Sequence, residues 1–104
     1  MNDIHKVLTD NRLTVMGPKK QVWLFESTRW KQRLRARFCE PMLRINGRLI
    51  WEFKTETPPI QSLRKLSAHW SRLVLLLDYE SQREREKGLV KASAGKLEHY
   101  SIRY

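Results

Sequence analysis

The basic side chains between residues 29 and 48 are the strongest candidates for chemistry in this sequence. In RWKQRLRARF, residues 29 to 38, a Lys or Arg stands at every second position and no acid interrupts the series. Arginine makes bidentate contacts with phosphate and stacks on flat rings, so such a series is typical of a surface that binds nucleic-acid backbone. With two nearby tryptophans, the candidate binding residues are Arg29, Lys31, Arg33, Arg35, Arg37, Arg44, Arg48, Trp30 and Trp51.

Composition supports a polyanionic partner without identifying it. The chain has 104 residues and a formal net charge of +10, and the segment from Arg29 to Arg48 alone holds seven Lys or Arg against one Glu. A balance of this kind favours association with DNA, RNA, an anionic membrane surface or an acidic protein surface. The same charges could also serve solubility only, or could protect a sheet edge from aggregation.

Catalytic and metal-binding patterns are weak by comparison. His5, His69 and His99 are scattered, and Cys39 is the only cysteine, so zinc-type spacing is absent from the sequence. Glu52 and Asp78 could form a carboxylate pair, and His99 could transfer protons if a pocket surrounded it. We therefore expect a non-enzymatic binding module without cofactor or metal. A small ribonuclease-type toxin is the enzymatic alternative, and it would require Lys, Arg, His or Tyr side chains to converge in a groove.

Periodicity predicts the elements of the first half of the chain. Alternation over residues 12–16 indicates a strand, and Gly17-Pro18 precedes a helix expected from about residue 18 to 31. Alternation resumes at Arg33, which predicts a strand with Arg33, Arg35 and Arg37 in one outward row and Leu34, Ala36 and Phe38 inward. Pro41 indicates that this strand is a sheet edge or contains a bulge.

Turn signals organise the second half. Asn46-Gly47 predicts a type I′ hairpin between residues 42–45 and 48–55. Thr57 is the expected N-cap of a helix that carries an apolar stripe from Ile60 to Trp70. Further strands are expected over residues 72–80, 89–93 and 96–104, with Ala94-Gly95 as the last turn.

This order predicts an α+β fold of the ferredoxin-like β-α-β-β-α-β plan. A C-terminal hairpin would extend the antiparallel sheet, and the helices would lie on one face. Residues 11–104 would form a single domain, and residues 1–10 a lead-in whose order the sequence leaves open. The uncovered face would carry Ile50, Val74 and Leu76 among polar residues, which makes it a candidate surface for a homodimer or another partner.

The remaining features bear on location. The longest apolar run, Leu73 to Leu77, is far shorter than the ~20 residues of a membrane-spanning helix. The N-terminal MNDIHKVLTD has no apolar signal segment, and a lone cysteine suits a reducing compartment. We therefore expect a cytoplasmic protein without a membrane partner.

Three stretches resemble a known family. NRLTVMGPKKQVWLF at residues 11–25, FKTETPPIQSLRKLSAHWSRLVLLLDYE at residues 53–80 and GLVKASAGKLEHY at residues 88–100 are similar to the YubB ferredoxin-like, or Api92-like, proteins of phages and plasmids. The Arg-rich segment 29–37 and the charged turn after Glu80 depart from that family's pattern. The resemblance implies a ferredoxin-like fold and a mobile genetic element as the source, and it carries no catalytic residue over to this sequence. It also suggests an inhibitor that binds a host defence protein as an alternative function.

Overall fold

The chain forms a six-stranded antiparallel sheet with three helices, as seen in a computed structural model that describes residues 7–104. The strands are β1 (Thr9–Met16), β2 (Arg37–Ile45), β3 (Arg48–Thr55), β4 (Val74–Ser81), β5 (Glu86–Ser93) and β6 (Lys96–Arg103). The helices are α1 (Lys19–Glu26), α2 (Trp30–Arg33) and α3 (Ile60–His69). The α+β class is thus confirmed.

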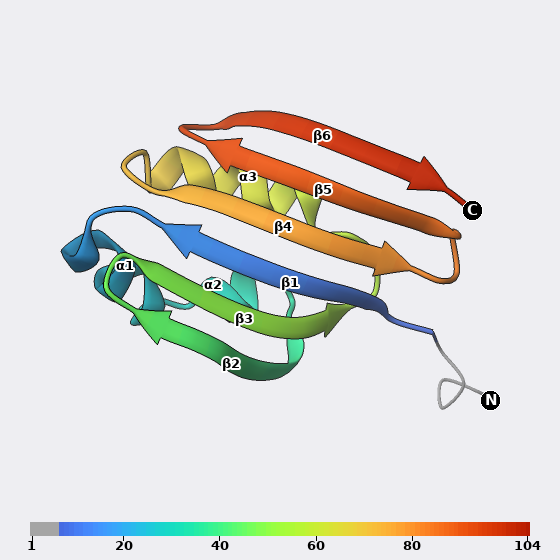
Figure 1. The fold of residues 1–104 in the computed structure, drawn as a ribbon, viewed down its shortest axis with the longest axis horizontal. Coiled ribbons are helices and arrows are strands. Elements are labelled where there is room, and N and C mark those ends of the chain that lie inside the picture. Colours follow the sequence, from blue (N-terminus) through green and yellow to red (C-terminus); the bar gives the residue numbers. More distant parts are fainter. Residues whose placement is uncertain (1–6) are drawn as a thin grey trace.

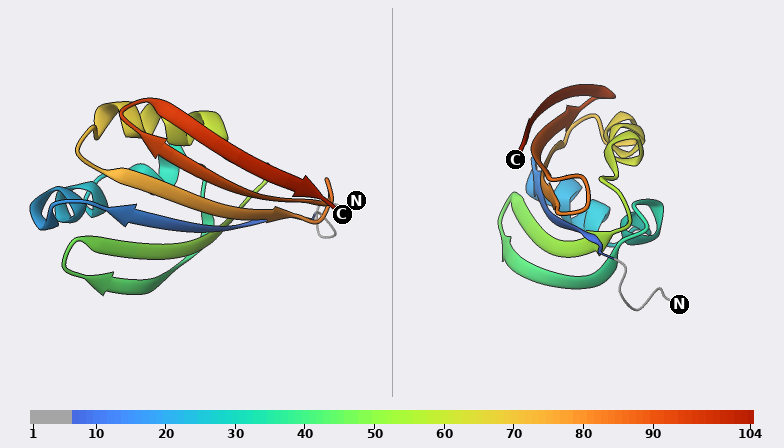
Figure 2. Two further views of the ribbon diagram at one scale, coloured as in Figure 1. Left: turned by 45° about the horizontal axis from the view of Figure 1, so that its top comes forward. Right: turned by 90° about the vertical axis from the view of Figure 1, so that its right-hand side faces the viewer.

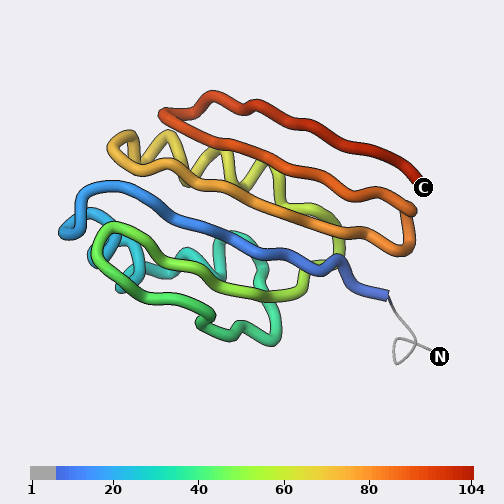
Figure 3. Tube along the Cα trace, in the orientation of Figure 1, coloured from blue at the N-terminus to red at the C-terminus, as the bar shows by residue number. Residues whose placement is uncertain are grey.

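The sheet order is β2-β3-β1-β4-β5-β6, and every neighbouring pair is antiparallel. Figure 1 shows β1 running through the middle, with the β2–β3 hairpin on one side and the β4–β5–β6 meander on the other. The tube in Figure 3 makes the same path easy to follow. The last two strands therefore extend the sheet past β4.

All three helices lie on one face of the sheet, which curves around them (Figure 2). Alternation decides this arrangement, because one set of strand residues is apolar and can be removed from water only under the helices. In β3, Leu49, Trp51 and Phe53 are buried, whereas Ile50 and Glu52 face the other way. The core is a single cluster on the helical side.

The helix expected from residue 18 to 31 is interrupted. α1 ends at Glu26, and the hydroxyls of Ser27 and Thr28 then donate to the carbonyls of Leu24 at 2.7 Å and Phe25 at 2.6 Å. Such side-chain bonds compete with helix continuation. The break lets Phe25 and Trp30 both enter the core, where their rings stack with centroids 5.8 Å apart.

The strand expected from Arg33 is also wrong, because Arg33 ends α2 and β2 begins only at Arg37. Arg35 takes a positive φ of 56°, and the amide of Ala36 donates to the carbonyl of Lys31 at 2.8 Å. This is the geometry of a left-handed helix C-cap. Leu34, the C-cap residue of α2, is buried, and Phe38 is exposed at a bulged position with φ 55°. The alternation at residues 33–38 therefore arises from a cap and a bulge.

Pro41 lies where its chemistry requires. β2 is an edge strand, and its register with β3 shifts between Arg37 and Glu40 and again between Pro41 and Leu43. Both parts of the expectation, an edge and a bulge, are confirmed.

The two-residue turns lie where they were expected, but the predicted type of the first turn is wrong. Ile45 pairs with Arg48 across Asn46-Gly47, yet only Gly47 has positive φ, at 73°, so the turn is not type I′. The left-handed pair occurs instead at Ala94-Gly95, with φ of 50° and 81°. The N-cap of α3 is Pro59 rather than Thr57, whose carbonyl accepts a hydrogen bond from the Thr55 hydroxyl.

Strand ends differ from expectation by a few residues. β1 begins at Thr9, inside the expected lead-in, and residues 1–6 lie outside the described part. β4 begins at Val74 instead of residue 72, and β5 begins at Glu86 instead of residue 89. The charged turn is consequently confined to residues 82–85.

Candidate nucleic-acid interface

Most of the net charge lies in the segments that form the helical side. Residues 17–36 and 57–73 hold nine Lys or Arg against one acid, Glu26, so they account for a charge of +8. Eight of the nine cations are exposed, and Lys31 is half-buried. We call this set the basic helical layer: Lys19, Lys20, Arg29, Lys31, Arg33, Arg35, Arg64, Lys65 and Arg72.

A groove between α2 and α3 concentrates part of this charge. It has a volume of about 680 Å³, and its walls include Arg33 from α2 with Arg64, Lys65 and His69 from α3. No acid lines it, and α3 itself contains none. Neither Arg33 nor Lys65 forms an ion pair with another residue between 7 and 104. These cations are therefore available to an anionic partner.

The residues singled out from the sequence divide between two regions. Arg29, Lys31, Arg33 and Arg35 belong to the basic helical layer, whereas Arg37, Arg44 and Arg48 belong to the β2–β3 hairpin. The predicted outward row of Arg33, Arg35 and Arg37 does not exist, because the three lie in a helix end, a cap and a strand start.

Two of the hairpin arginines are already paired. Arg37 lies 3.6 Å from the Glu56 carboxylate, and Arg44 forms an ion pair and two hydrogen bonds with Glu26. The contact with Glu26 raises the pKa of Arg44 above its usual value. It also ties β2 to α1, so its role is at least partly structural.

The structure places Trp30 and Trp51 in the core. Their exposed fractions are 1% and 7%, and their rings meet edge to face with centroids 5.6 Å apart. Lys31 covers Trp51 from outside, with Nζ 3.8 Å from the ring centroid. Neither indole presents a free face to an unstacked base.

Trp23 on α1 is the large exposed aromatic of the helical side, and sequence reasoning missed it. It is 72% exposed and lines a groove of about 350 Å³ between α1 and the β2–β3 hairpin. The helical period could have predicted this exposure, because Val22 and Phe25 point inward and Trp23 therefore points outward. The acid-free sequence of α3 carried the equivalent signal for Arg64 and Lys65.

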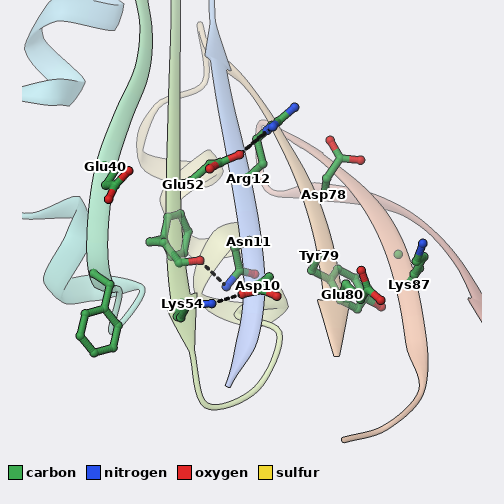
Figure 4. Close-up of a pocket in the computed structure, with 13 residues that line it drawn as sticks. Asp10, Asn11, Arg12, Glu40, Glu52, Lys54, Asp78, Tyr79, Glu80 and Lys87 are labelled. Carbon is green, nitrogen blue, oxygen red and sulfur yellow. Dashed lines mark hydrogen bonds and ion pairs between the residues drawn. The ribbon is translucent and has the colours of Figure 1, made fainter. Parts of the chain in front are cut away.

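The opposite, open face of the sheet has a different electrostatic character. A shallow depression there is lined by five acids, two of which are paired: Glu52 accepts from Arg12 at 2.6 Å, and Asp10 contacts Lys54 (Figure 4). Glu40 and Asp78 stand apart from each other in the same view, on separate strands. Glu52 and Asp78 share this face, but Arg12 lies between them in the strand register and pairs with Glu52, so the two acids form no carboxylate pair. With five acids in its lining, this face repels a polyanion more than the helical layer does.

One group of proton-transfer residues does come together, on β4, β5 and β6. The Tyr79 hydroxyl donates to Glu86 Oε2 at 2.9 Å and lies 2.7 Å from His99 Nε2. Since tyrosine has one hydroxyl proton, Nε2 of His99 must donate to Tyr79. Burial and the contact with Glu86 raise the pKa of Tyr79 to about 12, and the hydrogen bond from Tyr79 lowers that of Glu86. The cluster lies apart from the basic helical layer and joins three strands.

Metal and membrane features receive no support from the described residues. Between residues 7 and 104, no three His, Cys, Asp or Glu side chains lie close enough to hold a metal ion. No helix in that part of the chain has the length and apolar character needed to cross a membrane.

Comparison of the chain with protein-family models, with curated proteins and with solved structures found no match.

Proposed function

We propose that this protein binds the phosphate backbone of nucleic acid through the basic helical layer. The observation that carries the proposal is the acid-free groove between α2 and α3, where Arg33, Arg64 and Lys65 have no acidic neighbour in the lining. Phosphate contacts from Arg and Lys supply most of the affinity of such proteins and do not require base recognition. The sequence-based hypothesis is retained, but its centre moves from the edge strand to the helices.

Segregation of charge favours this function over charge that serves solubility alone. Charges that only keep a protein soluble can be spread over the whole surface, whereas here +8 of +10 belongs to the segments of one side. A one-sided distribution supports oriented binding to a polyanion.

The test compares two triple variants in titrations of fluorescent oligonucleotides at several salt concentrations. The groove variant is Arg33→Gln, Arg64→Gln and Lys65→Gln; the control variant is Lys87→Gln, Lys91→Gln and Lys96→Gln on β5 and β6, which removes the same charge. Log Kd should vary with log salt by about 0.7–0.9 per phosphate contact. We expect the slope of the groove variant to fall by the equivalent of two to three phosphate contacts. The slope of the control variant should fall by the equivalent of less than one contact.

Equal effects of the two variants would show that only net charge matters, and absence of binding by wild type at ~50 mM salt would remove the proposal. Retention of a single host protein from nuclease-treated lysate would instead support the inhibitor alternative. Cleavage of RNA by wild type but not by His99→Ala would support the ribonuclease alternative.

We also propose the ferredoxin-like plan as the finer description of the fold. The order β2-β3-β1-β4, with α1 and α2 before β2 and α3 before β4, supports it, and β5–β6 then form the extension. We further propose that the chain is related to the YubB-like proteins and comes from a mobile genetic element. A cytoplasmic location and a homodimer through the open face are also proposed.

A further inference from the structure

The groove beside Trp23 combines an exposed indole with cationic side chains. Lys19, Arg44 and Arg48 line it together with Trp23 and with Glu26, the ion-pair partner of Arg44. The remaining lining residues are Val22, Ile45, Asn46, Gly47 and Leu49. Lys19 lies one helical turn before Trp23, on the same side of α1. Within residues 7–104, neither Lys19 nor Arg48 forms an ion pair.

The ion pair between Arg44 and Glu26 makes this a built groove. It joins α1 to β2 on either side of the depression, so the two walls are held together. The amide of Gly17 donates to the carbonyl of Gly47 at 3.1 Å, which fixes the hairpin tip against the start of the helical segment. The indole of Trp23 is consequently presented on a fixed frame.

The chemistry of such a site favours an unpaired base flanked by phosphates. Base–aromatic stacking tolerates any base, because each has a π-face, and Lys and Arg beside the ring neutralise the adjoining phosphates. In a duplex the bases are already stacked and their faces are unavailable. The cations would also attract an acidic protein segment, but its Asp and Glu side chains have no flat ring to stack on the indole.

We propose that the Trp23 groove makes this protein a single-strand binder, in which one unstacked base lies on the Trp23 indole and its flanking phosphates contact Lys19 and Arg48. This inference rests on the proposed function, since it assumes that nucleic acid is the partner. It adds the substrate class, which the basic helical layer leaves open.

The test uses three 12-nucleotide ligands: a single strand, the corresponding duplex and an abasic single strand that keeps every phosphate. Wild type is compared with Trp23→Ala, with Trp23→Phe and with Phe38→Ala. Phe38 is a matched control, because it has the same exposed fraction of 72% but lines the acid-rich depression of the open face. Affinity is measured by anisotropy, and the wild-type indole emission is followed during titration.

We expect Trp23→Ala to weaken single-strand binding at least about tenfold and to leave duplex and abasic binding unchanged, with the salt slope preserved. Trp23→Phe should restore part of the loss, and Phe38→Ala should have no effect. Single-strand binding should quench the exposed Trp23, whereas Trp30 and Trp51 are buried and Trp70 is half-buried. The quenching should therefore be absent from Trp23→Phe.

Equal wild-type affinity for the normal and abasic strands would overturn the inference while leaving the proposed backbone binding intact. Binding to none of the three ligands would remove both. A 12-residue poly-glutamate that binds as tightly as the oligonucleotide, and is weakened equally by Trp23→Ala, would assign the groove to an acidic protein segment and also overturn it.

Discussion

At the scale of single residues, Gly88 and Tyr79 define one strict packing constraint. They face each other across β4 and β5, and a Cβ added at Gly88 would lie 2.2 Å from the Tyr79 ring. Glycine in a strand often marks such a close approach. The tyrosine ring occupies the space that any side chain at position 88 would need.

Gly88→Ala should therefore destabilise the protein by about 1–3 kcal/mol, the range of overpacked sites. Urea unfolding measures the difference. In a Tyr79→Leu background the same substitution should cost less, because the ring is gone. An equal cost in both backgrounds would mean that the glycine is required for another reason.

The buried tyrosine also predicts an alkaline limit to stability. The folded pKa of Tyr79 is about 12, above its ordinary value of 10.0. A group whose folded pKa is raised contributes stability that is present below the unfolded pKa and lost as pH rises. Between about pH 10 and 12, wild type should lose up to about 3 kcal/mol from this group.

Tyr79→Phe should remove that part of the pH dependence while it lowers stability near neutrality. Thermal melts at pH 7 to 11.5 provide the comparison. Tyr104, whose pKa is also raised by a hydrogen bond to Glu80, remains in both proteins, so its contribution cancels in the comparison. Parallel pH curves for the two proteins would contradict the assignment.

The residues of the candidate interface were only partly predictable from sequence. Composition identified the charge, and Arg29, Lys31, Arg33 and Arg35 do contribute to the basic helical layer. The two tryptophans were misassigned because an aromatic residue adjacent to arginine in sequence need not be adjacent on the surface. Arg64 and Lys65 join Arg33 only through the packing of α3 beside α2, which no local pattern encodes.

At the scale of elements, strand periodicity and turn residues predicted most of the sheet. The two-residue turns at Asn46-Gly47 and Ala94-Gly95 and the β2 edge were located from their Gly and Pro residues. The errors lie between residues 26 and 38. There the hydroxyl hydrogen bonds of Ser27 and Thr28 end α1, and the positive φ of Arg35 delays the start of β2. A hydrophobic pattern records neither of these features. The type I′ prediction for Asn46-Gly47 was also wrong, because Asn46 tolerates positive φ without requiring it.

The two hairpin glycines should respond differently to alanine. Both have positive φ, at 73° for Gly47 and 81° for Gly95, so each substitution carries a backbone cost of roughly 1–2 kcal/mol. A Cβ at Gly47 would also lie 2.9 Å from the Gly17 carbonyl oxygen, whereas at Gly95 the nearest atom is 3.4 Å away.

We therefore expect Gly47→Ala to lower the free energy of unfolding by about 1 kcal/mol more than Gly95→Ala, as overpacking adds to strain. Chemical denaturation of both variants measures this. The reverse order would indicate that the contact between Gly17 and Gly47 yields easily.

For the molecule as a whole, a one-sided charge has a cost in stability. Nine cations share the helical segments with one acid, and like charges repel most at low salt. The groove variant Arg33→Gln, Arg64→Gln, Lys65→Gln should therefore melt higher than wild type in ~20 mM salt, by a few degrees. The gap should narrow at ~500 mM salt, where screening removes the repulsion.

Calorimetry at the two salt concentrations measures these melting temperatures. The control variant at Lys87, Lys91 and Lys96 should gain less, because the open face and β6 hold acids nearby, Glu98 among them. A larger increase in melting temperature for the control variant would mean that the strongest repulsion lies outside the basic helical layer.

The central position of β1 has a consequence for biosynthesis. This strand is made first, yet its partners are β3, with Thr9 opposite Thr55, and β4, with Met16 opposite Val74. On the ribosome, β1 emerges with both edges unpaired and acquires its first neighbour only after about half the chain is synthesised. The β2–β3 hairpin and the β4–β5–β6 meander are local and can close as they appear. A nascent chain is therefore most exposed to misassociation before β3 has been translated. Slow codons after residue 55 would pause the chain when β1 can already pair with β3, whereas slow codons before residue 55 would prolong the interval in which β1 is unpaired.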